Sequence, residues 1–119
     1  MPFNSHKYVP KGWGGEVWIW NSGLYCGKKL ILKKGKRCSL HFHPQKTETF
    51  YVQSGKVQME LKHTDGSEEK LVLQPGDSVH LPAGTIHRFI GIEDSEIFEF
   101  STPHSDEDVV RVEKGDTLS

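Results

Sequence analysis

The sequence predicts an all-β protein that folds as one sandwich or barrel, and three observations carry this prediction. The chain has 119 residues, which suits a single domain with one hydrophobic core. From residue 16 onward, short runs rich in β-branched and aromatic residues alternate with turns that contain glycine, asparagine or aspartate. No stretch of about 12 residues repeats its apolar side chains with the 3.6-residue period of an amphipathic helix.

Taken in order, the chain divides into an arm and a β domain. Residues 1–15 are rich in glycine, proline and polar side chains, and we expect them to form an N-terminal arm or loop. Residues 16–119 are expected to form the domain, with a last strand or turn after residue 106. The strands predicted before that tail lie at 16–20, 25–34, 39–43, 49–53, 56–63, 69–74, 77–82, 87–92 and 96–101.

Composition and charge argue against several classes of function. A formal net charge of −1 and a pI near 6.6 give no support for binding to nucleic acid or to a membrane surface. No apolar run is long enough to cross a bilayer, and the first fifteen residues lack the apolar core of a signal peptide. Cys26 and Cys38 fit neither a C-x-x-C pair nor a disulfide framework, so we expect reduced thiols and a cytoplasmic protein.

Several residues that could bind a metal ion lie within residues 35–55. His41 and His43 are separated by one residue, so in an extended strand both imidazoles face the same side. Pro44 then interrupts the strand, and Glu48 begins a second apolar run. If the second run pairs back against the first, its carboxylate can reach both imidazoles. Two neutral imidazoles and one carboxylate suit a divalent ion of Zn, Mn, Fe, Co or Ni.

A further imidazole follows downstream. Pro82 and Gly84 predict a turn, and His87 comes directly after it, so His87 is expected to be the fourth ligand. Strand alternation places further side chains on the same inward face as these ligands, and they would surround the ion with a mainly apolar pocket of the kind that small molecules occupy. The side chains expected to face inward are Ser39, Phe50, Val52 and Phe89.

These spacings resemble the paired motifs of the cupin superfamily. The first motif, G-x5-H-x-H-x4-E-x6-G, is met by Gly35, His41, His43, Glu48 and Gly55. The second, G-x5-P-x-G-x2-H-x3-N, is met by Gly76, Pro82, Gly84 and His87, but Gly91 stands where the asparagine is expected. The resemblance implies a single-domain cupin jelly-roll β-barrel with one divalent metal ion. The missing asparagine is not a metal ligand in that family.

The resemblance can be narrowed to one branch of the superfamily. Residues 12–119 resemble the C-terminal domain of type II phosphomannose isomerases and related small sugar isomerases, through an opening element around Trp13, residues 35–55, and an acidic element that ends at Arg111. This implies a metal-dependent aldose–ketose isomerase that acts on a sugar or sugar phosphate through an enediolate. It also favours a homodimer that pairs through exposed strand edges.

Isomerisation requires a base, and Glu99 is the candidate. If Glu99 faces the interior, opposite Phe98 and Phe100, burial is expected to raise its pKa toward a working range. The alternative is that Glu99 faces solvent while the two phenylalanines form the core. Other polar side chains are candidates for holding the substrate, although the cationic ones can equally belong to the surface. These candidates are Lys46, Arg88, Arg111 and His104.

The sequence leaves alternative hypotheses open for the function and for several residues. The site suits an Fe- or Ni-dependent dioxygenase as well as an isomerase, and a non-enzymatic protein that binds a metal or a sugar is a third possibility. The tryptophans between residues 13 and 20 fit core or dimer packing, or stacking against a substrate. His80 is expected at the surface, and the acidic run 106–108 in a solvated loop.

Overall fold

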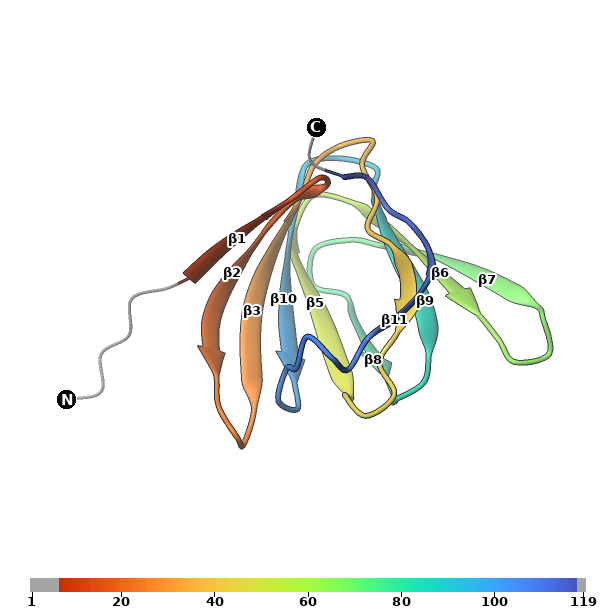
Figure 1. The fold of residues 1–119 in the computed structure, drawn as a ribbon. Coiled ribbons are helices and arrows are strands. Elements are labelled where there is room, and N and C mark those ends of the chain that lie inside the picture. The colour runs from red at the N-terminus through yellow and green to blue at the C-terminus, as the bar shows by residue number, and fades with distance from the viewer. Residues whose placement is uncertain (1–6, 118–119) are drawn as a thin grey trace.

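The computed structural model describes residues 7–117, which form eleven strands in two antiparallel sheets that face each other (Figure 1). The six-stranded sheet has the order β1 (Lys7–Lys11), β2 (Gly14–Asn21), β3 (Cys26–Leu32), β10 (Ser95–Ser101), β5 (Glu48–Ser54) and β8 (Ser78–Leu81). The five-stranded sheet has the order β11 (Val110–Glu113), β4 (Leu40–Phe42), β9 (Ile86–Gly91), β6 (Val57–Lys62) and β7 (Glu68–Leu73). Strands close in sequence are shared between the sheets, as in a jelly roll, so the predicted fold class is confirmed.

The core lies between the sheets and follows the alternation of the strands. Every second residue of β3 is buried from Cys26 to Leu32, and the same pattern runs along β5 from Glu48 to Val52. Phe50, Val52 and Phe89 are buried as predicted. The apolar members of the core are Trp13, Leu30, Leu32, Cys38, Phe50, Val52, Val57, Met59, Leu73, Leu81, Phe89 and Ile97.

Each predicted strand is present with small shifts at its ends, and the structure adds β1, which the sequence analysis placed in an arm. β1 pairs along its whole length with β2, from Lys7 opposite Trp18 to Lys11 opposite Gly14. It contains Pro10, a residue that an edge strand tolerates because one side of that strand has no hydrogen-bonding partner. The boundary after residue 15 stays a prediction, and residues 1–6 of the expected arm lie outside the described residues.

The glycine that replaces the motif asparagine has a steric explanation. A Cβ atom on Gly91 would lie 2.5 Å from the carbonyl oxygen of Lys33 and 3.2 Å from Cγ of Leu32. The backbone there is held closely, because the Gly91 amide donates to the Lys36 carbonyl at 2.9 Å and the Gly35 amide donates to the Gly91 carbonyl at 2.7 Å. A side chain at position 91 would therefore require the backbone to move.

Two expectations about the chain as a whole can be compared with the structure. Cys26 and Cys38 are both buried free thiols, in agreement with the prediction. Residues 7–117 contain no helix that could span a membrane.

Candidate metal centre

Three imidazoles meet on the inner face of the five-stranded sheet. His41 on β4 lies opposite His87 on β9 in the strand register, and His43 follows directly after β4. The potential ligand atoms of the three side chains all lie within 4.8 Å of one another. The structure thus brings together the three histidines that the sequence analysis singled out.

Backbone carbonyl groups hold all three rings in the same way. A carbonyl oxygen only accepts hydrogen bonds, so each ring nitrogen bonded to one must carry the hydrogen. This leaves the lone pair on Nε2 of each neutral ring, which is the arrangement that metal-binding histidines use. The Nδ1–H groups of His41, His43 and His87 donate to the carbonyl oxygens of Ser39 at 2.8 Å, Asp108 at 2.7 Å and Thr85 at 2.9 Å.

Glu48 adds a carboxylate from the opposite sheet. It is the first residue of β5, and its Oε1 lies 3.4 Å from Nε2 of His43 while its Oε2 lies 3.5 Å from Nε2 of His87. Three imidazole lone pairs and a carboxylate fit a divalent transition metal. Such an ion would be held by both sheets at once.

Burial sets the protonation of this cluster. Burial lowers the pKa of His41 to about 3 and that of His87 to about 4, and it also lowers the pKa of His43. All three rings are therefore neutral near pH 7 and able to bind a metal. Burial, reinforced by the nearby Glu99 carboxylate, raises the pKa of Glu48 to about 7. A cation beside Glu48 would stabilise its ionised form and lower this raised pKa.

Lys46 joins Glu48 to the predicted base. Its Nζ lies 3.1 Å from Oε1 of Glu48 and 3.0 Å from Oε2 of Glu99, which also accepts a hydrogen bond of 2.8 Å from the Ser101 hydroxyl. Glu99 faces the interior, whereas Phe100 is 58% exposed on the outer face. The alternative in which Glu99 faces solvent is therefore wrong.

The expected rise in the pKa of Glu99 is also wrong. Burial alone does raise the pKa of this carboxyl, but the positive charges of Lys46 and Lys28 and the Ser101 hydrogen bond together outweigh burial. The net effect holds the pKa of Glu99 below its ordinary value. Glu99 is accordingly a carboxylate near neutral pH, and a carboxylate can accept a proton.

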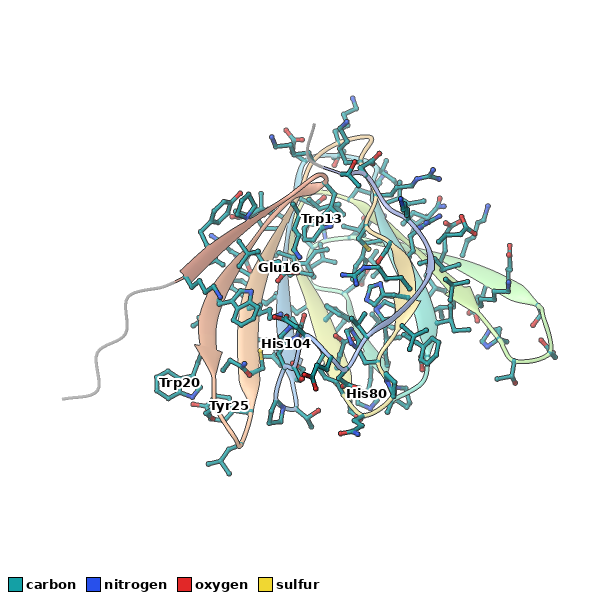
Figure 2. All side chains as sticks on the ribbon, in the orientation of Figure 1. Trp13, Glu16, Trp20, Tyr25, His80 and His104 are labelled. Atoms are coloured by element: carbon teal, nitrogen blue, oxygen red, sulfur yellow. The ribbon has the colours of Figure 1, made fainter. Side chains whose placement is uncertain are left out.

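These groups line one cavity of about 440 Å³ between the sheets. His104 and Glu16 project into the space between the sheets (Figure 2). The His104 ring accepts a hydrogen bond from Lys46 Nζ at 3.3 Å through Nδ1, and donates one to Asp106 at 2.9 Å through Nε2. Arg111 reaches the cavity from β11, where it lies opposite His41 in the register. Lys46, His104 and Arg111 thus all lie at the candidate site.

Arg88 does not lie there. Its side chain is buried elsewhere, donating to the carbonyl oxygens of Cys38 and Lys114 at 3.1 Å each and lying 3.5 Å from Glu113. These contacts join β9 to the C-terminal segment, and Arg88 is not among the residues that line the cavity. His80 is exposed, as predicted, with the Thr49 hydroxyl 2.9 Å from its Nδ1.

The sequence analysis missed a buried lysine in the cavity. Lys28 is 2% exposed, and its Nζ lies 3.4 Å from Oε1 of Glu16 and 4.3 Å from the ring centroid of Trp18. Its place between Cys26 and Leu30 in the inward alternation of β3 was the available signal. Trp18 lines the cavity beside it, and stacking of this ring against a substrate stays a prediction. Trp13 is buried in the core, and Trp20 is 39% exposed on the outside of β2 (Figure 2).

Comparison with known proteins supplies relatives for this arrangement. The Cupin domain family matches residues 29–101. A quercetin 2,3-dioxygenase of Bacillus subtilis is 45% identical over 56 residues, which cover 47% of this chain and 15% of that protein. A D-lyxose/D-mannose isomerase of Thermosediminibacter oceani is 33% identical over 111 residues, with 74% of this chain and 61% of that protein covered. The chain thus spans less than two thirds of either relative.

Among solved structures, the capsular polysaccharide assembling protein CapF from Staphylococcus aureus superposes with a TM-score of 0.80 at 19% sequence identity. The superposition covers 92% of this chain and 34% of CapF. At this level of identity, the similarity concerns the fold alone.

Proposed function

The chain belongs to the cupin domain family, and from that premise we propose that it is a metal-dependent aldose–ketose isomerase acting on a sugar or sugar phosphate. One observation carries the proposal: the Glu99 carboxylate faces the cavity beside the histidine cluster, 3.0 Å from Lys46, which in turn contacts Glu48. A base next to a metal site is what proton transfer between adjacent carbons requires. The similarity to an enzyme named as a D-lyxose/D-mannose isomerase supports the same class of reaction.

The proposed metal ligands are His41, His43, Glu48 and His87, and a divalent ion bound by them would polarise the carbonyl group of an open-chain sugar. Glu99 would take the proton from the carbon next to that carbonyl and return it to the former carbonyl carbon, while one hydroxyl proton passes between the oxygens on these two carbons. Lys46 fixes the position of Glu99 and keeps it ionised through their ion pair at 3.0 Å. The cavity of about 440 Å³ lies within the range of small-molecule sites, roughly 300–1,000 Å³.

Other residues of the cavity would bind the parts of the substrate that do not react. Arg111 and His104 present polar groups to the cavity, and Trp18 lines it with the Lys28 ammonium group 4.3 Å from the centroid of its ring. Aromatic rings bind the apolar face of a sugar, while charged groups bond its hydroxyls. We assign these four residues to substrate binding.

Two measurements test the proposal. Elemental analysis of protein purified without a metal-affinity tag should give about one divalent ion per chain, and His87→Ala should lose most of the metal, because it removes one of the imidazoles. A panel of aldoses and ketoses incubated with the loaded protein in deuterated water under nitrogen should show deuterium incorporation at carbon 2 of one sugar. A protein that binds metal but exchanges no carbon-bound proton in any sugar is not an isomerase.

The similarity to quercetin 2,3-dioxygenase favours a second candidate, an Fe- or Ni-dependent dioxygenase, because the shared 56 residues amount to 47% of this chain. The experiment under nitrogen separates the two, since isomerisation needs no O2. Turnover that appears only when O2 is admitted would favour the dioxygenase.

We further propose that the protein is a homodimer, as the resemblance implies, and that it pairs through the outer face of the six-stranded sheet in place of the strand edges expected from the sequence. The outer face of the six-stranded sheet carries Trp20, Phe100 and Tyr51, which are 39%, 58% and 37% exposed, and the rings of Phe98 and Phe100 stack there at 6.4 Å. The register places Phe98 opposite Tyr51 of β5, and Gly27 of β3 lies between Phe100 of β10 and Trp20 of β2, so this aromatic surface extends over neighbouring strands. A second copy of the chain could cover this surface.

A further inference from the structure

The acidic run at residues 106–108, expected in a solvated loop, contacts the candidate metal centre, and we propose that Asp108 is a positioning residue for His43 and for the turn after it. This inference rests on the metal site described under the proposed function. It assigns a structural role at that site to the C-terminal segment, which supplies none of the four proposed ligands.

Asp108 makes three hydrogen bonds to the segment that carries His43. Its carbonyl oxygen accepts from Nδ1–H of His43 at 2.7 Å, the shortest of the three bonds that orient the imidazoles. Its two carboxylate oxygens accept separately from consecutive backbone amides, those of Gln45 and Lys46, at 2.9 Å each. One residue thus holds the ring of a proposed ligand and the backbone of the turn that follows.

The turn depends on an acceptor of this kind because of its sequence. It connects β4 of one sheet to β5 of the other, so its shape sets how the histidines meet Glu48. Pro44 has no amide hydrogen, and the next two amides both point to Asp108. A carboxylate is the side chain that can accept from two amides at once. The turn also carries Lys46, which pairs with Glu48 and Glu99.

Asp108 is itself fixed from both sides. Its own amide donates to the Ser105 carbonyl at 3.0 Å. Just after it, β11 pairs with β4, with Val110 opposite Phe42 and Arg111 opposite His41. The bonds from Asp108 to the turn are therefore made by an anchored segment, and they can hold Nε2 of His43 in a fixed direction. Groups that orient metal ligands commonly change metal affinity by about 10–100-fold when they are removed.

The experiment measures cobalt(II) binding by the full chain, because the visible spectrum of this ion reports the geometry of its ligands. Asp108→Asn keeps the size of the side chain but leaves only one acceptor oxygen for two amides. Asp108→Ala removes both acceptors. We expect the affinity for cobalt to fall about 10–100-fold, with a shifted spectrum, and to fall further in the alanine variant than in the asparagine variant.

Glu107→Gln is the matched control, since it removes a neighbouring negative charge from an exposed side chain. It should leave both the affinity and the spectrum unchanged. The inference is overturned if the Asp108 variants lower only thermal stability, while cobalt affinity and spectrum match those of the parent. If Asp108→Ala does not fold, the asparagine variant decides between these outcomes. A parent protein that binds no cobalt at all would contradict the metal site itself, and the inference with it.

Discussion

At the scale of single residues, the cavity contains, besides Lys28, three charged side chains that are almost completely withdrawn from water. Lys46, Glu48 and Glu99 are 3%, 3% and 4% exposed. Buried charges are costly unless they are paired and hydrogen-bonded, and here one lysine bonds to both carboxylates. Lys28 adds a second buried positive charge, so the pKa of Glu99 is held low by two lysines. Glu48 would gain a further partner if a divalent ion were bound by the three histidines.

Glu99→Gln tests the proposed base. The amide keeps the shape of the side chain but cannot take up a proton at neutral pH, so the isomerisation rate should fall about 10²–10⁴-fold while the metal content stays the same. Deuterium exchange and metal analysis measure the two quantities. Glu96→Gln is the control, because Glu96 is on the same strand but pairs with Lys29 at 3.2 Å, with its side chain 41% exposed. A Glu99 variant as active as the parent would show that another group is the base.

The buried histidines predict how the stability of the metal-free protein depends on pH. The pKa values of His41 and His87, about 3 and about 4, are below the ordinary value of 6.5, so below pH 6.5 the unfolded chain binds more protons than the folded protein. Stability should therefore fall as pH falls through this range. Glu48, with its pKa raised to about 7, acts in the opposite direction, but one carboxyl opposes three imidazoles, because the pKa of His43 is lowered as well.

The net loss is expected to be on the order of 1 kcal/mol per pH unit between about pH 6 and pH 4. Urea unfolding at several pH values, in the presence of a chelator, measures it. His87→Gln removes one of the three imidazoles and should make the dependence on pH clearly shallower. A midpoint that is constant or rises on acidification would contradict this account.

The residues that could be predicted from the sequence differ from those that could not in the origin of their contacts. His41, His43, Glu48 and His87 could be found because strand alternation and short spacings determine where they point. Asp108 could not, because its contacts join residues 62–65 positions apart, and these depend on tertiary packing. The pKa of Glu99 was predicted in the wrong direction because burial is visible in the strand pattern, whereas its lysine partner is 53 residues away.

At the scale of elements, the strands of the jelly roll were predictable because each has inward apolar residues and ends near a turn signal. β1 was not, because proline and charged residues in KYVPK are typical of loops and also of edge strands. The pairing between strands also had to come from the structure. For example, β3 and β10 are neighbours although more than 60 residues separate them.

The close contact between β9 and the segment after β3 predicts a large effect of a small change. Gly91→Ala should destabilise the protein by about 1–3 kcal/mol, because its Cβ would lie 2.5 Å from the Lys33 carbonyl oxygen and the backbone would have to move. Gly27→Ala in β3 is the control, since its Cβ meets nothing within 4 Å. Urea midpoints compare the two. Equal stability of the Gly91 variant and the parent would show that the contact relaxes without cost.

At the scale of the whole molecule, the aromatic outer face of the six-stranded sheet predicts the oligomeric state. Light scattering at micromolar concentration should give about twice the chain mass of 13.5 kDa. Phe100→Glu should reduce the mass to that of one chain, because a carboxylate would be buried in the interface. Val72→Glu places the same charge at a side chain that is 54% exposed on β7 of the other sheet, and should leave the dimer intact. A parent mass of 13.5 kDa would rule out the dimer at that concentration.

The proposed ligands come from both sheets, Glu48 from the six-stranded one and His41 and His87 from the five-stranded one. A bound ion would therefore act as a cross-link through the middle of the sandwich, in addition to its chemistry. Ligands that bind only the folded state stabilise it in proportion to the logarithm of their concentration over the dissociation constant. The lifetime of the folded chain in a cell would then depend on metal supply, and a shortage of the ion would remove the protein itself as well as its activity.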